Sequence, residues 1–143
     1  MTPETAFLAR MMEVAPDDAD RMYLGKGPQQ PVLPVAIVLL IDDIRDSHLR
    51  GGQWHGRARI QLDVYMAEAS DVDSYTEANT FYERLHGVED GSALAGYRGH
   101  VGGTPGGMFI EEIRRLDRQS LYEPDEMRLV RIRADYFVYY RAH

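Results

Sequence analysis

The sequence predicts a single α+β domain, residues 1–143, in which a mainly antiparallel sheet of about four strands carries two helices packed on one face. Three observations support this prediction. Residues 55–66 and 128–141 alternate apolar and polar residues, as half-buried strands do. Two other segments, near the N-terminus and after residue 71, repeat apolar residues at helical spacing. The chain has no internal repeat and no linker long enough to divide it, so one domain is expected.

The first helix is expected to begin at Thr2-Pro3-Glu4. A capping hydroxyl, a proline at the first helical position and an acid in the first turn are typical of a helix start. Pro16 ends this helix, and residues 15–34, which are rich in glycine and proline, predict a loop with room for a short strand at residues 21–24. The apolar stripe of the helix consists of Phe7, Leu8, Met11 and Met12.

Two strands are expected next. Residues 35–41 are a β-branched and leucine run that predicts a strand covered on both faces, and Gly51-Gly52 marks a turn after it. The strand at residues 55–66 places two rows of side chains on opposite faces of the sheet. Its inward row is Ala58, Ile60, Leu62, Val64 and Met66, and its outward row is Arg57, Arg59, Gln61, Asp63 and Tyr65.

A second helix is expected to open at residues 71–74 and to stop at Gly87, which suits a left-handed cap. Its buried stripe is Ala78, Phe81, Tyr82 and Leu85. Residues 96–107 hold six glycines and predict no regular element, whereas residues 108–118 predict a strand. The last strand, residues 128–141, has Val130, Ile132, Ala134, Tyr136, Val138 and Tyr140 in one row, and Leu129, Arg131, Arg133, Asp135, Phe137 and Tyr139 in the other.

Composition excludes several classes of protein. The chain has no cysteine, so it has neither disulfides nor thiolate metal sites, and its acidic N-terminal stretch does not resemble a signal peptide. The longest apolar run, residues 35–41, is far shorter than the ~20 residues of a membrane-spanning helix. A net charge of -7, from 23 acids against 16 bases, disfavours sequence-independent binding of nucleic acid by the whole surface.

No set of residues predicts catalysis, so we expect no enzyme, no cofactor and no metal. The acids Asp42, Asp43, Asp63 and Glu111 could hold magnesium in a small nuclease or hydrolase, but the one lysine, Lys26, lies in a distant loop. Carboxylates paired with the abundant arginines are the simpler interpretation. The histidines form no helical metal-binding pair, and the serines lack the glycine-flanked turn of a hydrolase nucleophile.

Arginine and aromatic residues on strand faces remain, and these types are enriched where proteins meet. We therefore predict a subunit or partner interface, with an ordinary solvent-facing row as the alternative. The glycine-rich segment is expected to be mobile in the free subunit and to contribute two anchors, because glycine is costly to order without a partner surface. The predicted interface residues are Arg57, Arg59, Asp63, Tyr65, Arg131, Arg133, Phe137, Tyr139, Tyr97 and Arg98.

The segments PVAIVLLIDD, GRARIQLDVYM, DSYTEANTFYERLHG and GMFIEEIRRLDRQSLYEPDEMRLVRIRADYFVYY, in this order, resemble the tail completion, or tail terminator, family of long-tailed bacteriophages. The most specific marks are the basic strand at residues 59–65, the helix carrying Tyr75 and Glu77-Ala78, and Leu121-Tyr122-Glu123-Pro124 before an aromatic strand. The similarity spans about residues 20–141. This sequence departs from the family in its long glycine-rich segment and around residues 26–31.

The resemblance implies a non-enzymatic virion protein that is assembled in the cytoplasm of a bacterial host; gene transfer agents use similar proteins. Such proteins form a ring, usually a hexamer, at the head-proximal end of the tail, where they end polymerisation of the tail tube. The implied partners are other copies of the chain, the tube protein and a head-side connector, adaptor or stopper; DNA passes through the lumen without specific binding, and no membrane is involved. Two alternatives stay open: the carboxylate- or metal-dependent nuclease or hydrolase above, and a monomeric binding adaptor.

Overall fold

The computed structural model describes residues 1–29, 33–47, 54–67, 73–102, 107–123 and 129–141. Predictions that concern the residues between these ranges, Pro124 among them, lie outside the described part of the chain. The elements, in chain order, are α1 (Pro3–Val14), the 3-10 helix η1 (Pro16–Arg21), β1 (Met22–Leu24), β2 (Val35–Ser47), β3 (Trp54–Ala67), α2 (Asp73–His86), β4 (Gly99–Val101), β5 (Met108–Glu123) and β6 (Leu129–Arg141).

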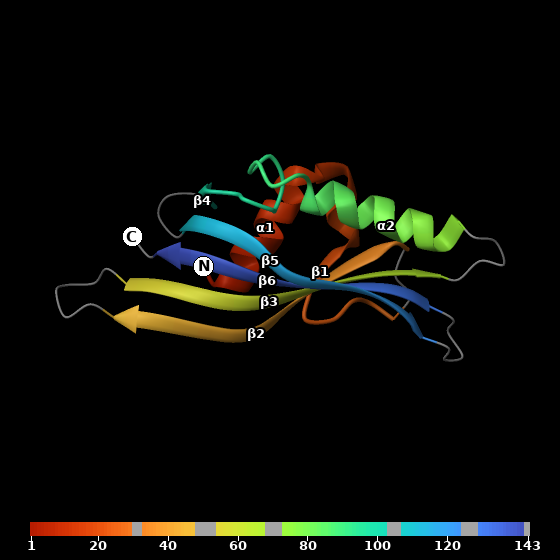
Figure 1. Cartoon of the computed structure of the whole chain (residues 1–143), viewed down its shortest axis with the longest axis horizontal. Helices are drawn as coiled ribbons and strands as arrows, with labels where there is room; N and C mark the ends of the chain where they lie inside the picture. The colour runs from red at the N-terminus through yellow and green to blue at the C-terminus, as the bar shows by residue number, and fades with distance from the viewer. Residues whose placement is uncertain (30–32, 48–53, 68–72, 103–106, 124–128, 142–143) are drawn as a thin grey trace.

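The strands form one curled, mixed sheet in the order β1-β2-β3-β6-β5-β4 (Figure 1). β1 is parallel to β2, and all other neighbours are antiparallel. The prediction of an α+β fold with a mainly antiparallel sheet agrees with this arrangement, but the number of strands was wrong. Six strands are present instead of about four, because the short strands β1 and β4 extend the two edges of a sheet whose four long strands are β2, β3, β6 and β5.

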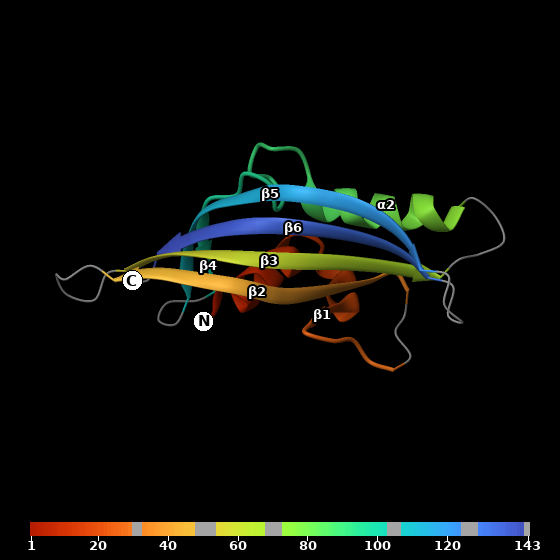
Figure 2. The same ribbon diagram turned by 60° about the horizontal axis from the view of Figure 1, so that its bottom comes forward.

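Both α-helices lie on the same side of the sheet, and the core fills the space between (Figure 2). The inward row predicted for β3 is buried from Ala58 to Val64, and the row from Ile132 to Tyr140 in β6 is buried as well. From α1, Phe7 and Met11 reach this core; α2 contributes Ala78, Phe81, Tyr82 and Leu85. The alternating pattern therefore assigned these rows to the correct face.

Local chemistry explains the ends of the helices. The Thr2 hydroxyl accepts a hydrogen bond from the Thr5 amide, and the Thr5 hydroxyl accepts one from the Thr2 amide, so α1 begins in a capping box. At the C-terminal end of α2, Gly87 has φ +72°, and its amide donates to the Glu83 carbonyl. A side chain at this position would be strained, which explains the glycine.

Four strand predictions require correction. β5 continues to Glu123, past the predicted end at residue 118, and the run at residues 35–41 is not covered on both faces, because Leu40 and Ile41 are exposed. Residues 99–101, which lie in the glycine-rich segment predicted to have no regular structure, form β4 and pair with residues 108–110 of β5. Strand β2 runs through Ser47, past the apolar run that ends at Ile41. This charged continuation buries little apolar surface, but its backbone pairs with β3 as one arm of a long hairpin.

Candidate interaction surface

The face of the sheet opposite the helices carries most of the predicted interface residues. Residues directly opposite each other on antiparallel strands share a face, and the register of β3 and β6 therefore places their outward rows side by side. The register pairs Arg57 with Tyr139, Arg59 with Phe137, Asp63 with Arg133, and Tyr65 with Arg131. Eight of the ten predicted residues thus form one surface, which we name the open face.

A buried ion pair lies within the open face. The Arg131 guanidinium donates to both carboxylate oxygens of Asp63, over 3.1 and 2.9 Å. The Gln61 amide also donates to Asp63 (2.8 Å), and Arg133 donates to the Gln61 carbonyl oxygen (2.6 Å). Asp63 and Gln61 are only 2% and 4% exposed. Asp63 is therefore a structural partner of Arg131 inside the subunit. At this place the open face exposes part of the Arg131 side chain and not the carboxylate.

Aromatic and charged residues alternate along the rest of the open face. The Arg57 guanidinium lies 4.6 Å from the centre of the Phe137 ring, and Phe137 meets Tyr139 edge to face at 6.0 Å. Arg59 donates to one oxygen of Asp135 (3.2 Å), and the other oxygen of Asp135 is buried with no hydrogen-bond partner in the described structure. These two residues border a hollow of about 240 Å³, whose other lining residues are Asp117, Gln119 and Arg133.

Tyr97 and Arg98 do not lie together. The Tyr97 ring packs against the core under the Arg10 guanidinium, 3.8 Å away, and its hydroxyl donates to the His100 carbonyl. Arg98 instead lies over the ring of Phe109. The prediction that this segment needs a partner surface to be ordered was wrong for its described part, because Val101 is fully buried and Tyr97 packs on the core. Residues 103–106 lie outside the described range.

The two edges of the sheet form a feature that the sequence interpretation missed. β1 covers β2 only as far as Val38, and residues 39–47 have no strand beside them on that edge within the described chain. On the other edge, β4 pairs with residues 108–110 of β5, and the Gly96 amide bonds to the Ile113 carbonyl; beyond this point no described strand covers residues 114–123.

Both of these open edges contain a β-bulge with a protruding aliphatic side chain. The register of β2 shifts between Leu40 and Asp42, and that of β5 shifts between Arg115 and Asp117. The extra residues at these shifts are Ile41, 49% exposed, and Leu116, 42% exposed. Leu40 and Ile44 are also exposed on β2. An uncovered strand with exposed aliphatic residues can pair with a strand of another chain.

The carboxylates of the nuclease or hydrolase alternative do not converge. Asp43 receives hydrogen bonds from the Tyr140 hydroxyl and Arg45, Asp63 is paired with Arg131, and Glu111 contacts His55 at 3.0 Å. In the described residues, no three histidine, aspartate or glutamate side chains gather as a metal site would require. The described helices also include none that is long and apolar enough to cross a membrane.

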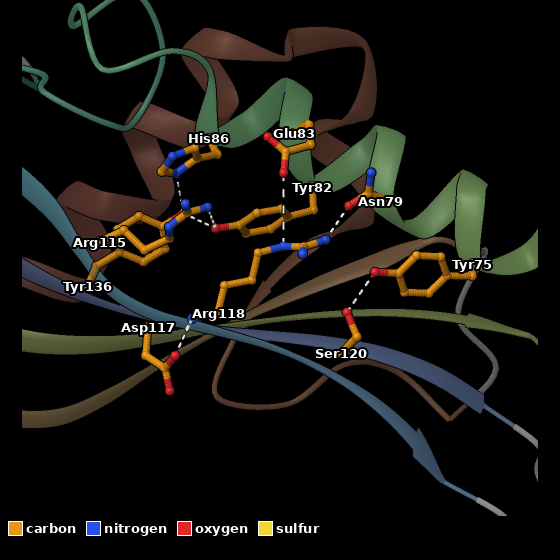
Figure 3. Close-up of polar contacts among 10 residues, drawn as sticks. All are labelled: Tyr75, Asn79, Tyr82, Glu83, His86, Arg115, Asp117, Arg118, Ser120 and Tyr136. Carbon is orange, nitrogen blue, oxygen red and sulfur yellow. Dashed lines mark hydrogen bonds and ion pairs between the residues drawn. The ribbon is translucent and has the colours of Figure 1, made fainter.

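Beneath α2 lies a buried polar cluster of Tyr82, His86, Arg115 and Tyr136 (Figure 3). Tyr82 was predicted to be buried, but the burial of His86 and its contact with Tyr136 were not predicted. The hydroxyls of Tyr82 and Tyr136 are 2.7 Å apart, His86 Nδ1 lies 2.9 Å from the Tyr136 hydroxyl, and Arg115 donates to the Tyr82 hydroxyl over 3.3 Å. Burial raises the pKa of both tyrosines and lowers the pKa of His86. The i, i+4 spacing of Tyr82 and His86 is the sequence signal that could have indicated this cluster.

Comparisons with known proteins give a match in structure alone. No protein-family model and no curated protein matches the sequence. Among solved structures, a chain of the "Virion of native gene transfer agent (GTA) particle" is similar over 98% of this chain and 95% of its own length, with a TM-score of 0.54 and 10% sequence identity. The two chains share a fold. At this identity the likeness extends to the fold and no further.

Proposed function

We propose that this chain is a structural component of the virion of a tailed phage or gene transfer agent. In this proposal the chain forms a ring, most simply of six copies, at the head-proximal end of the tail tube. The ring ends tube polymerisation and joins the tail to the head-side connector, while DNA passes through its centre. The observation that carries the proposal is the fold shared, along nearly the whole of both chains, with a component of a gene transfer agent virion.

The two open edges support a ring built by strand pairing. The four long strands alternate in direction, so β2 and β5 run in opposite directions at the two ends of the series. A second copy related by rotation about an axis roughly along the strands would present its β2 to the β5 of the first copy. That contact would be antiparallel and heterologous, and repetition of the same rotation closes a ring when the last copy meets the first.

Charge supports the pairing of these edges. On the uncovered part of β2, Asp42 is exposed, and on the uncovered part of β5, Arg114 is exposed, whereas Arg115 and Arg118 of β5 contact α2. Opposite charges on paired edges favour association and oppose pairing of either edge with a copy of itself. Ile41 and Leu116 supply apolar surface to the same contact.

The open face and the net charge are compatible with a DNA conduit. The charged residues of the open face are largely paired with each other, as in Arg131 with Asp63 and Arg59 with Asp135. Six copies at -7 each carry a formal charge of -42. A negatively charged wall repels phosphate, which favours passage of DNA over tight binding.

Electron microscopy and light scattering test this proposal. Purified protein at high concentration, or mixed with tail tube, is expected to give closed rings in negative stain and a mass that is a multiple of 16.3 kDa. Antibody against the chain is expected to label the head-proximal end of tails in intact particles. A 16.3 kDa monomer at every concentration, together with absence from purified particles, would contradict the proposal.

A further inference from the structure

In the cluster beneath α2, each group donates a hydrogen bond to the next, from Arg115 through the two tyrosines to His86. A guanidinium can only donate, so the Tyr82 oxygen accepts from Arg115 (3.3 Å). The Tyr82 proton is then directed to the Tyr136 oxygen (2.7 Å), and the Tyr136 proton to His86 Nδ1 (2.9 Å). In this order every proton of the series has an acceptor, and His86 is neutral with its own proton on Nε2.

We propose that this series is an acid-sensitive latch, which holds α2 on the sheet while His86 is neutral and releases α2 when His86 takes up a proton. The series runs from β5 through α2 to β6 and back to the last residue of α2, so it joins the helix to two strands (Figure 3). The proposal concerns the stability of the subunit itself and does not depend on the function proposed above.

Protonation of His86 breaks the order of the series. The new Nδ1–H donates to the Tyr136 oxygen, so four protons now compete for the three contacts of the series. Each contact holds one proton, and either the Tyr82 or the Tyr136 proton is left without an acceptor among the four groups. Tyr82 is fully buried and His86 is 4% exposed, and a buried donor without a partner is costly.

The charges around His86 add to this effect. Two arginines of β5, Arg115 and Arg118, oppose a positive charge on His86, whereas Glu83 of α2 and Glu89 after it favour one. The other titratable groups that face it are the hydroxyls of Tyr82 and Tyr136. Burial raises the pKa of both, so both hydroxyls stay neutral. Burial and then Arg115 make the largest contributions, and the balance lowers the pKa of His86 below its ordinary value.

The contacts of α2 with β5 are polar, and water can replace them when the helix separates. The Tyr75 hydroxyl bonds to Ser120 (2.7 Å), Arg118 donates to Asn79, and Arg118 lies 3.9 Å from Glu83 (Figure 3). Both helices bury apolar side chains in the core, Ala78, Phe81 and Leu85 from α2 and Ala6, Phe7 and Met11 from α1. Of the two helices, however, only α2 supplies members of the hydrogen-bonded series. Acid is therefore expected to open α2 and leave α1 in place.

The sign of the pH dependence follows from the lowered pKa. The unfolded or opened state binds the proton at the ordinary histidine pKa of about 6.5, and the closed state binds it only at lower pH. The full contribution to stability is present above about pH 6.5 and is lost progressively as the pH falls from there toward the pKa of the closed state. Between these two values, the opening equilibrium constant rises up to tenfold per pH unit.

Amide hydrogen exchange and histidine NMR test the latch on the whole chain. From pH 7.5 to 5.5, after correction for the intrinsic rates, protection of residues 73–86 is expected to fall by up to about tenfold more than protection of residues 3–14. His86→Asn keeps a neutral acceptor near the position of Nδ1 and is expected to abolish this difference. Tyr136→Phe removes the donor to Nδ1 and is expected to lower the protection of α2 already at pH 7.5.

Three results would overturn the latch. They are equal loss of protection in α1 and α2 of the wild-type chain, an undiminished acid effect in a folded His86→Asn variant, and wild-type His86 carrying its proton on Nδ1 at pH 7.5. The last measurement needs no variant, so the proposal remains testable if the substituted chains fail to fold. His86 is assigned among the five histidines by its short distance to the Tyr136 ring.

Discussion

Arg131 and Asp63 form a bidentate ion pair within the open face, with N–O distances of 3.1 and 2.9 Å and side chains that are 17% and 3% exposed. The two residues come from neighbouring strands, β6 and β3. The Asp63 carboxylate is buried, although an ordinary solvent-facing row would leave it exposed at this position. This relationship determines which substitutions on the open face report on assembly and which report on folding.

Removal of the buried carboxylate is expected to destabilise the subunit. Asp63→Ala leaves Arg131 and the Gln61 amide without their common acceptor, and the free energy of unfolding is expected to fall by roughly 3–5 kcal/mol. The matched control is Glu112→Ala, because Glu112 is half exposed and lies 3.9 Å from the exposed Arg114. That change is expected to cost less than about 1 kcal/mol. Urea unfolding measures both values, and equal costs would contradict the structural role of Asp63.

Buried positions of β6 are expected to be more sensitive to substitution than an exposed position of β5. Ile132 is fully buried, and Ile132→Ala is expected to cost roughly 2–5 kcal/mol. Arg131→Glu is expected to lower the melting temperature as well, because it places a second acid beside Asp63. Arg114→Glu, at an exposed position of β5, is expected to leave the melting temperature within a few degrees of wild type. Calorimetry that ranks Arg114→Glu beside Ile132→Ala would show that the faces are assigned wrongly.

The open edges are expected to control assembly without controlling folding. Ile41→Lys and Leu116→Lys each introduce a charge at an exposed bulge, and each is expected to prevent ring formation while the melting temperature changes little. Val88→Lys is the matched control, because Val88 is 67% exposed and lies in the segment after α2, on neither edge strand. Light scattering distinguishes the outcomes: rings from the two edge variants would exclude edge pairing, and loss of rings in the control would make the test uninformative about the edges alone.

The described part of the glycine-rich segment is expected to be ordered in the free subunit. The backbone of residues 99–101 pairs with β5, and Val101 is fully buried. Exchange of the paired amides is therefore expected to be slower than exchange of the amide of the exposed residue Glu89 by about tenfold or more. Tyr97→Ala removes a ring that packs on the core and is expected to weaken this protection. Equal exchange at the two places would restore the earlier expectation of a mobile segment.

Periodicity explains how much of the fold the sequence predicted. A strand with one buried face must alternate, so residues 58–64 of β3 and 132–140 of β6 were assigned to the correct face. A short strand was considered at residues 21–24, where β1 lies, but the three-residue strand β4 is too short to show any period, and the glycines around it favour a loop. The second half of β2 is charged, and its pairing depends on the backbone of β3, which a local pattern does not reveal.

The candidate surface was predicted as a set of residues but not as a set of contacts. Alternation placed Asp63 and Arg131 on one face, whereas their pairing depends on a register between strands that are 68 residues apart in sequence. The open edges could not be predicted for a related reason. An edge is defined by the strand that is missing beside it, and this follows from the order β1-β2-β3-β6-β5-β4 alone.

The open edges of β2 and β5 offer backbone amides and carbonyls, which every residue type except proline supplies in the same form. A contact made through such groups places few demands on the side chains that accompany it. Mutations can accumulate along both strands for long periods while the docking geometry persists, provided that the bulges and the direction of each strand are kept. Relatives of this chain are therefore expected to have its strand order and edge lengths in common, long after their residues have ceased to correspond.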